Sequence, residues 1–103
     1  MKIFLFATSL CFCAAVICAA LAFAADGQKM YAKCAGCHGA DGSKKAMGSG
    51  VPLKGLKADA LAKALEGYKA KTYGGVHKSI MEGQAANLSP EDIKALSAYI
   101  ATF

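Results

Sequence analysis

The chain has 103 residues, with 12 basic and 7 acidic side chains and a formal net charge of +5. This length allows one small domain and no more. All 12 basic residues are lysine and are scattered without interleaved aromatic residues, so the composition argues against a nucleic-acid-binding protein.

Residues 1–24 have the pattern of a secretory signal peptide. Lys2 precedes a nearly uninterrupted apolar run over residues 3–25, and Ala22-Phe23-Ala24 provides an A-x-A cleavage site. We therefore predict export to the periplasm, cleavage after Ala24 and a mature domain of residues 25–103. The run is also long enough to span a bilayer as an uncleaved anchor. Its alanine-rich end favours cleavage, which leaves no stable membrane insertion.

Cleavage reduces the cysteine count from five to two, because Cys11, Cys13 and Cys18 lie in the leader. The 79 remaining residues then have no disulfide framework, and their 11 lysines against 7 acidic residues give a net charge of +4. A domain of this size rarely stabilises itself through its own core, so a further stabilising element is expected.

The first predicted helix begins at Asp26, a residue type that caps helix N-termini. Spacings of i, i+4, i+7 and i+11 define one stripe of this helix: Gly27, Tyr31, Cys34 and His38. Turn-forming residues at positions 39–43 end it. The stripe predicts that one face of the helix is turned toward the core.

The two remaining cysteines lie in a C-x-x-C-H motif, Cys34-Ala35-Gly36-Cys37-His38, which is typical of attachment of a c-type haem. Side chains at i and i+3 of a helix share a face, with Cβ atoms about 5–6 Å apart. Cys34 and Cys37 can therefore form two thioether bonds to one haem, and His38 can bind the iron as the proximal axial ligand. A covalently bound haem also supplies the missing stabilising element.

Three other interpretations of the motif are weaker. A zinc site needs four ligands, with His77 as the fourth, and the adjacent Cys37 and His38 are poorly placed to reach one tetrahedral centre. A thioredoxin-like dithiol needs a surrounding βαβ pattern, and the chain has no strand-like alternation. A plain disulfide leaves His38 unexplained.

The elements after the motif are also predicted to be helical. Residues 43–58 are expected to form a long loop, because glycines and Pro52 interrupt every helical period. Helices are predicted over residues 59–68, with Leu61 and Leu65 on a buried stripe, and over residues 76–83.

The last helix has the clearest start signals, with Ser89 as N-cap, Pro90 at the first helical position and acidic residues in the first turn. No strand pattern occurs, so the predicted fold is all-α, with about four helices. The predicted buried stripe of the last helix consists of Ile93, Leu96, Ile100 and Phe103.

One histidine leaves the sixth position of a haem iron to be filled. The candidate side chains are Met30, Met47, His77 and Met81. Met30 lies four residues before Cys34 on the same predicted helix, from which it cannot reach the opposite haem face. Met47 lies in a glycine-rich segment without rigid support. Met81 lies on a predicted helix with enough chain to wrap around the haem, and it is the predicted ligand. His77 and an open site remain alternatives.

The chain resembles the class I monohaem c-type cytochromes, and in particular the periplasmic cytochrome c-553 group of sulfate-reducing bacteria. Essentially the whole mature chain is similar. The residues that carry the resemblance are Cys34 to Ser43, Met47-Gly48-Ser49, Tyr73-Gly74-Gly75, Met81 and Ser89-Pro90-Glu91-Asp92.

The resemblance implies that Cys34 and Cys37 hold one haem c, with His38 and Met81 as axial ligands of the iron. It implies that the carbonyl of Pro52 accepts a hydrogen bond from the His38 ring. It further implies that the first and last helices cross, with Gly27 and Tyr31 near Leu96 and Tyr99.

The predicted function is that of a soluble, monomeric, periplasmic electron carrier and not an enzyme, because two filled axial positions leave no site for a substrate. Its expected partners are periplasmic dehydrogenases or oxidases with acidic docking surfaces. Lysines expected near the haem edge are Lys44, Lys45, Lys54, Lys69, Lys71 and Lys78. The alternative is a haem protein with an open or labile sixth site, acting as a small peroxidase or a gas-binding protein.

Overall fold

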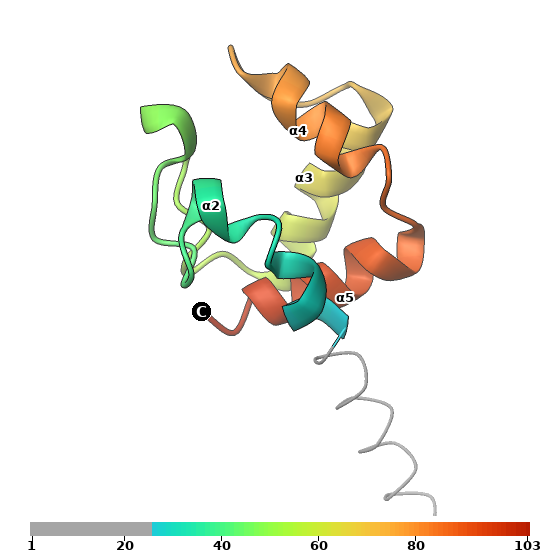
Figure 1. Ribbon diagram of the computed structural model, residues 1–103. Coiled ribbons are helices and arrows are strands. Elements are labelled where there is room, and N and C mark those ends of the chain that lie inside the picture. The colour runs from blue at the N-terminus through green and yellow to red at the C-terminus, as the bar shows by residue number, and fades with distance from the viewer. Residues whose placement is uncertain (1–25) are drawn as a thin grey trace, which may run out of the picture.

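The structure is a computed structural model that describes residues 26–103, so the predicted signal peptide lies outside the described residues. The described elements are a helical segment at residues 26–31, α2 (Ala35–His38), the 3-10 helix η1 (Ala46–Gly48), α3 (Ala58–Ala70), α4 (Lys78–Ala85) and α5 (Pro90–Ile100) (Figure 1). Residues 26–103 contain no strand, which confirms the all-α prediction. No helix in this range has the length and apolar character needed to cross a membrane.

The predicted first helix is interrupted, which corrects the expectation of one continuous helix from Asp26 to His38. A turn at residues 32–34 separates the N-terminal helical segment from α2. In this turn the backbone N–H of Cys34 donates to the Tyr31 carbonyl at 2.8 Å, a bond that spans three residues where an α-helix spans four. The interruption lets the N-terminal segment lie against α5 while α2 turns away from it (Figure 1).

The middle helices form close to their predicted positions. α3 extends the predicted range by one residue at its start and two at its end, and it ends at Lys71, which adopts a left-handed conformation with φ 62°. α4 begins two residues later than predicted, so His77 is its N-cap and lies outside the helix. α3 packs against both α4 and α5.

The start of α5 forms as predicted. The Ser89 side chain accepts a hydrogen bond from the Asp92 backbone N–H at 3.1 Å, and the Asp92 carboxylate accepts one from the Ser89 N–H at 3.0 Å. This capping box satisfies two backbone donors at the helix start. Ile93, Leu96 and Ile100 are buried as predicted, whereas Phe103 lies beyond the helix and is only half-buried.

Replacing Ser89 with alanine is expected to lower the free energy of unfolding by about 1 kcal/mol, because Asp92 N–H loses its acceptor. For a domain of this size the melting temperature then falls by about 4–8 °C. Thermal unfolding followed by circular dichroism measures the change. Ser89→Gly is the control and costs only a few tenths of a kcal/mol; an alanine variant as stable as the glycine variant would contradict the role of the cap.

The core lies where α5 crosses the N-terminal segment and packs on α3. Its buried members are Tyr31, Leu61, Leu65, Ile93, Leu96 and Ile100. At the crossing, a Cβ added to Gly27 would lie 2.4 Å from the Ala95 carbonyl oxygen and 2.7 Å from Cβ of Tyr99. The two helices therefore touch at their backbones, at the place that the family resemblance implied.

Candidate haem site

The C-x-x-C-H motif lies on α2 and the residue that caps it. Cys34 is the N-cap, and the His38 N–H donates to its carbonyl at 2.9 Å, which keeps the motif helical. Cys34 and Cys37 are thus three residues apart on one helical turn, which places them on one face as expected. Cys34 is half-buried against the core, and Cys37 is exposed.

Burial dominates the electrostatics of the motif. Burial raises the pKa of the Cys34 thiol, with Cys37 adding to the effect and Lys33 opposing it. Nucleophilic cysteines of thioredoxin-like proteins instead have a lowered pKa. Burial also lowers the pKa of His38, which favours the neutral form of its imidazole. A neutral imidazole is the form that binds a metal ion.

The imidazole of His38 makes no hydrogen bond within residues 26–103, and its Nδ1 atom is buried without a partner. The hydrogen bond to the Pro52 carbonyl, which the resemblance implied, is therefore not formed in this structure. The loop after Pro52 is anchored elsewhere: the N–H groups of Leu53 and Lys54 donate to the Gly42 carbonyl at 2.7 and 3.0 Å. A buried nitrogen without a partner is costly, so the ring is suited to a group that the polypeptide does not supply.

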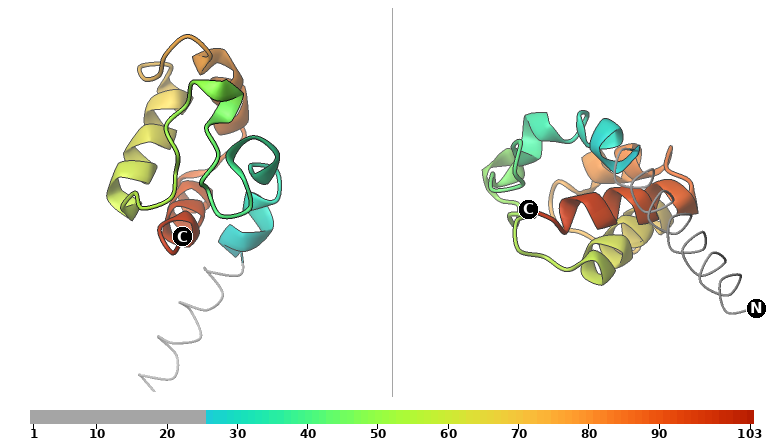
Figure 2. Two further views of the ribbon diagram at one scale, coloured as in Figure 1. Left: turned by 90° about the vertical axis from the view of Figure 1, so that its left-hand side faces the viewer. Right: turned by 90° about the horizontal axis from the view of Figure 1, so that it is seen from below.

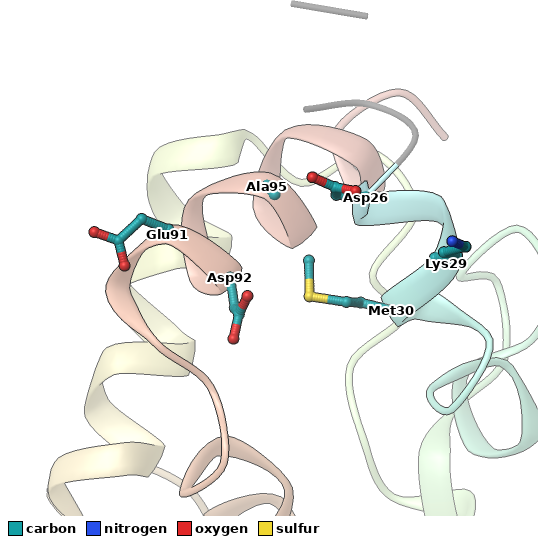
Figure 3. A pocket seen from close by; sticks show the side chains of 6 residues that line it. All are labelled: Asp26, Lys29, Met30, Glu91, Asp92 and Ala95. Carbon is teal, nitrogen blue, oxygen red and sulfur yellow. The ribbon is translucent and has the colours of Figure 1, made fainter. Parts of the chain in front are cut away.

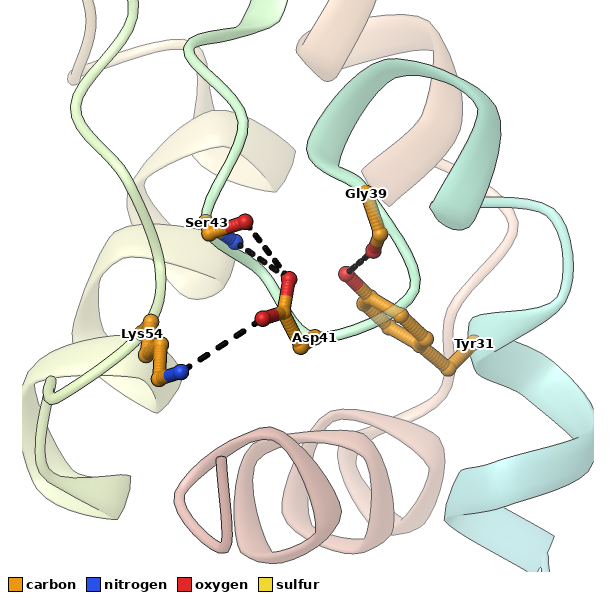
Figure 4. Close-up of polar contacts among 5 residues, drawn as sticks. All are labelled: Tyr31, Gly39, Asp41, Ser43 and Lys54. Atoms are coloured by element: carbon orange, nitrogen blue, oxygen red, sulfur yellow. Dashed lines mark hydrogen bonds and ion pairs between the residues drawn. The ribbon is translucent and has the colours of Figure 1, made fainter.

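The turn after α2 is held by a small polar cluster (Figure 4). The Asp41 carboxylate accepts hydrogen bonds from Ser43 Oγ at 2.6 Å and Ser43 N at 3.1 Å, and it pairs with Lys54 Nζ at 3.4 Å. These contacts, with the Ser43 bonds first, lower the pKa of Asp41. On the other side of the turn, the Tyr31 hydroxyl donates to the Gly39 carbonyl. The chain that follows His38 is thus restrained from both sides.

The four candidates for the sixth ligand are placed very differently. Met81 lies on α4 and packs, half-buried, against the core cluster that Cys34 also borders. His77 is exposed and is the N-cap of α4, so it lies outside the helix that carries Met81. Met47 is 59% exposed in η1. Met30 points into a cavity of about 270 Å³ between the N-terminal segment and α5 (Figure 3).

Large apolar side chains are exposed on two segments. The exposed fractions are 59% for Met47, 70% for Val51, 52% for Tyr73, 87% for Val76 and 45% for Ile80. The segments around η1 and the start of α4 both lie at the end of the molecule away from the crossing of α5 with the N-terminal segment (Figure 1, Figure 2). A large apolar prosthetic group would remove such surface from water, so these residues fit a haem.

The Tyr-Gly-Gly sequence before α4 has a packing role. Tyr73 packs edge-on against Tyr68 of α3, with ring centroids 5.0 Å apart. Gly74 has φ 115°, and a Cβ there would lie 2.7 Å from the Tyr68 ring. Only glycine fits this close approach without strain. The chain that leads to Met81 is thereby fastened to the end of α3.

The motif does not line the cavity beside Met30. It does not line a second cavity of about 420 Å³ either, which lies between α3 and α5 next to Asp59, Ala62 and Pro90. Within the described part of the chain, no group of three or more His, Cys, Asp and Glu side chains is arranged to hold a metal ion. The site is therefore identified by the motif, with two cysteines on one helical face and an imidazole for which residues 26–103 provide no hydrogen bond, and not by the cavities.

This arrangement on a small helical domain is that of a c-type cytochrome, a conclusion that comparison with known proteins supports. Residues 24–103 match the family of cytochrome c. The chain belongs to this family, as a class I monohaem c-type cytochrome that carries covalently bound haem c with its iron. The helical architecture agrees with the class I fold.

Several bacterial cytochromes c-553 are similar to the chain. That of Nitratidesulfovibrio vulgaris (strain DSM 19637 / Miyazaki F) is 51% identical over 90 residues, which cover 82% of this chain and 88% of that protein. That of Desulfomicrobium norvegicum is 50% identical over 78 residues, covering 75% and 95%. A Helicobacter pylori (strain ATCC 700392 / 26695) cytochrome c-553 is 40% identical over 79 residues, covering 77% and 79%. The resemblance to the c-553 group is confirmed, and the chain is an electron-transfer cytochrome.

Proposed function

We propose that this cytochrome is a periplasmic electron carrier in which Cys34 and Cys37 hold the haem through thioether bonds and His38 and Met81 are the axial ligands. The observation that carries the proposal is the half-buried imidazole of His38, for which residues 26–103 provide no hydrogen bond and which directly follows Cys34 and Cys37 on one helical turn. Met81, half-buried at the border of the same core, is the best-placed second ligand.

The bound haem supplies a one-electron ferric–ferrous couple. The polypeptide determines what this couple can do. Filling both axial positions with His38 and Met81 excludes substrates, and the thioether sulfur favours the ferrous form relative to a second histidine. The turn that follows His38 is held by the Tyr31 hydroxyl and by the Asp41 cluster, which restrains the chain next to the proposed ligand.

The proposed partners are redox proteins with acidic docking surfaces, met in small and transient contacts. All six lysines expected near the haem edge are exposed. Two of them already have protein partners: Lys54 pairs with Asp41, and Lys69 donates to the Leu88 carbonyl. The charge that steers a partner is therefore expected from the other four: Lys44, Lys45, Lys71 and Lys78.

The test is expression of the full chain in a bacterial host that attaches haem c in its periplasm. We expect a product that begins at Ala25 by mass, keeps its haem in denaturing electrophoresis, and shows a low-spin ferric spectrum with a methionine-to-iron charge-transfer band. A high-spin spectrum with rapid carbon monoxide binding would overturn the carrier proposal in favour of a haem protein with an open sixth site.

A further inference from the structure

Tyr31 joins the aromatic core to the turn that follows the haem motif. Its side chain is only 3% exposed. Its ring packs edge-on against Phe103 with centroids 4.9 Å apart, and tilted against Tyr99 with centroids 5.8 Å apart. Its hydroxyl donates to the carbonyl oxygen of Gly39 at 2.5 Å (Figure 4). One side chain is thus fixed in the core at its ring and bonded to the motif's end at its tip.

The acceptor of this bond lies directly after His38. Gly39 has φ 87° and ends α2, and its carbonyl also accepts the Gly42 N–H at 3.3 Å. The His38 carbonyl accepts the Lys44 N–H at 3.0 Å. These two backbone bonds stay within the turn. The Tyr31 hydroxyl, by contrast, ties the turn to the N-terminal segment across the interruption at residues 32–34.

The His38 ring makes no hydrogen bond of its own within the described residues. Its orientation therefore depends on how firmly its backbone is held. The Tyr31 hydroxyl can act as a donor throughout the neutral range, because burial, followed by the charges of Cys34 and Asp41, raises its pKa.

We propose that Tyr31 is a positioning residue for the proximal ligand: its hydrogen bond to Gly39 fixes the backbone of His38 and, through it, the rotation of the imidazole over the haem. This inference rests on the proposed role of His38 as an iron ligand. Tyr31 would then have two separate roles: its ring stabilises the fold, and its hydroxyl sets the orientation of the proximal ligand.

The test compares three variants of the haem-loaded protein. Tyr31→Phe keeps the ring and removes the hydrogen bond. Tyr99→Phe removes a hydroxyl from the same aromatic cluster, for which residues 26–103 provide no hydrogen bond. Phe103→Leu weakens the packing around Tyr31 but leaves its hydroxyl in place. The readouts are the hyperfine-shifted haem methyl resonances of the ferric protein, which report the rotation of the axial imidazole, and the ferrous-to-ferric ratio at a fixed ambient potential.

We expect Tyr31→Phe alone to change the pattern of methyl shifts. A less firmly held imidazole donates less to ferric iron, so the ferrous-to-ferric ratio should also rise by about threefold to tenfold, tenfold being about 59 mV for one electron. The other two variants should keep the wild-type pattern, even where Phe103→Leu lowers the melting temperature.

Two outcomes would overturn the inference. One is a wild-type methyl pattern in Tyr31→Phe, and the other is the same changed pattern in Phe103→Leu; either result would reduce Tyr31 to a packing residue. Failure of the proposed function looks different, because the wild-type protein itself would then lack the methionine-to-iron band. If Tyr31→Phe does not accumulate with haem, the comparison is made with Tyr31→Met, which keeps an adaptable apolar side chain in the core and has no hydrogen-bond donor.

Discussion

Replacing Met81 with alanine is expected to open the sixth coordination position, abolish the methionine-to-iron band and let the ferrous protein bind carbon monoxide rapidly. The reduction potential should fall by on the order of 0.1 V or more, because axial ligands tune haem potentials over about 0.8 V and methionine raises them. The fold should survive, since Met81 is half-buried at the edge of the core and not at its centre. Ferric absorption spectra, carbon monoxide mixing and redox titration measure the three effects.

Two other methionines provide matched controls. Met47 is 59% exposed in η1, so Met47→Ala should leave the band and the potential almost unchanged. Met30 lines the cavity between the N-terminal segment and α5, so Met30→Ala should lower stability but keep the band. If Met81→Ala keeps the charge-transfer band, Met81 is not the sixth ligand. If Met47→Ala loses the band, Met47 is the ligand instead.

The parts of the fold that are most predictable from the sequence depend on contacts between residues close together in the chain. The Ser89 cap, the proline after it and the glycine that ends α2 each act within a few residues, so their residue types predict the structure directly. The buried stripe of α5 follows from helical periodicity for the same reason. The residues of the haem motif were likewise recognisable from spacing, although their roles as ligands stay predictions.

The interruption at residues 32–34 was not predictable from periodicity. Tyr31, Cys34 and His38 keep a helical spacing, and neither glycine nor proline occurs at the break. The chain turns there because Tyr31 is held on both sides by distant partners, α5 at its ring and the Gly39 carbonyl at its hydroxyl. Tertiary contacts of this kind override local preference, and a sequence pattern does not encode them.

Polar contacts between residues far apart in the sequence were also not predicted, because they too depend on the tertiary structure. Lys54 and Asp41 are 13 residues apart, and Lys69 and Leu88 are 19 apart, so only the folded chain shows that these lysines have partners. The start of α4 was misplaced by two residues because Val76 and His77 fit a helical pattern, yet both belong to the exposed loop that Tyr73 and Gly74 fasten to α3.

The crossing of the N-terminal segment with α5 leads to the largest expected stability effect. In Gly27→Ala the new Cβ would lie 2.4 Å from the Ala95 carbonyl oxygen, a backbone atom of α5 that cannot rotate away. The helices must separate, and such overpacking costs about 1–3 kcal/mol. We expect the upper part of this range, because the contact is between backbones on both sides, and a fall in melting temperature of about 8–20 °C.

Gly83→Ala is the matched control, because Gly83 lies inside α4 and a Cβ there meets no atom within 4 Å. This variant should gain about 0.5–1 kcal/mol from the better helix former, so the two alanines have opposite signs. Thermal unfolding of the haem-loaded proteins compares them. Because Tyr31 follows Gly27 by one helical turn, separation of the helices should also loosen the bond to Gly39, and the haem methyl pattern of Gly27→Ala should shift toward that of Tyr31→Phe. An unchanged melting temperature for Gly27→Ala would mean that the helices do not meet at this backbone contact.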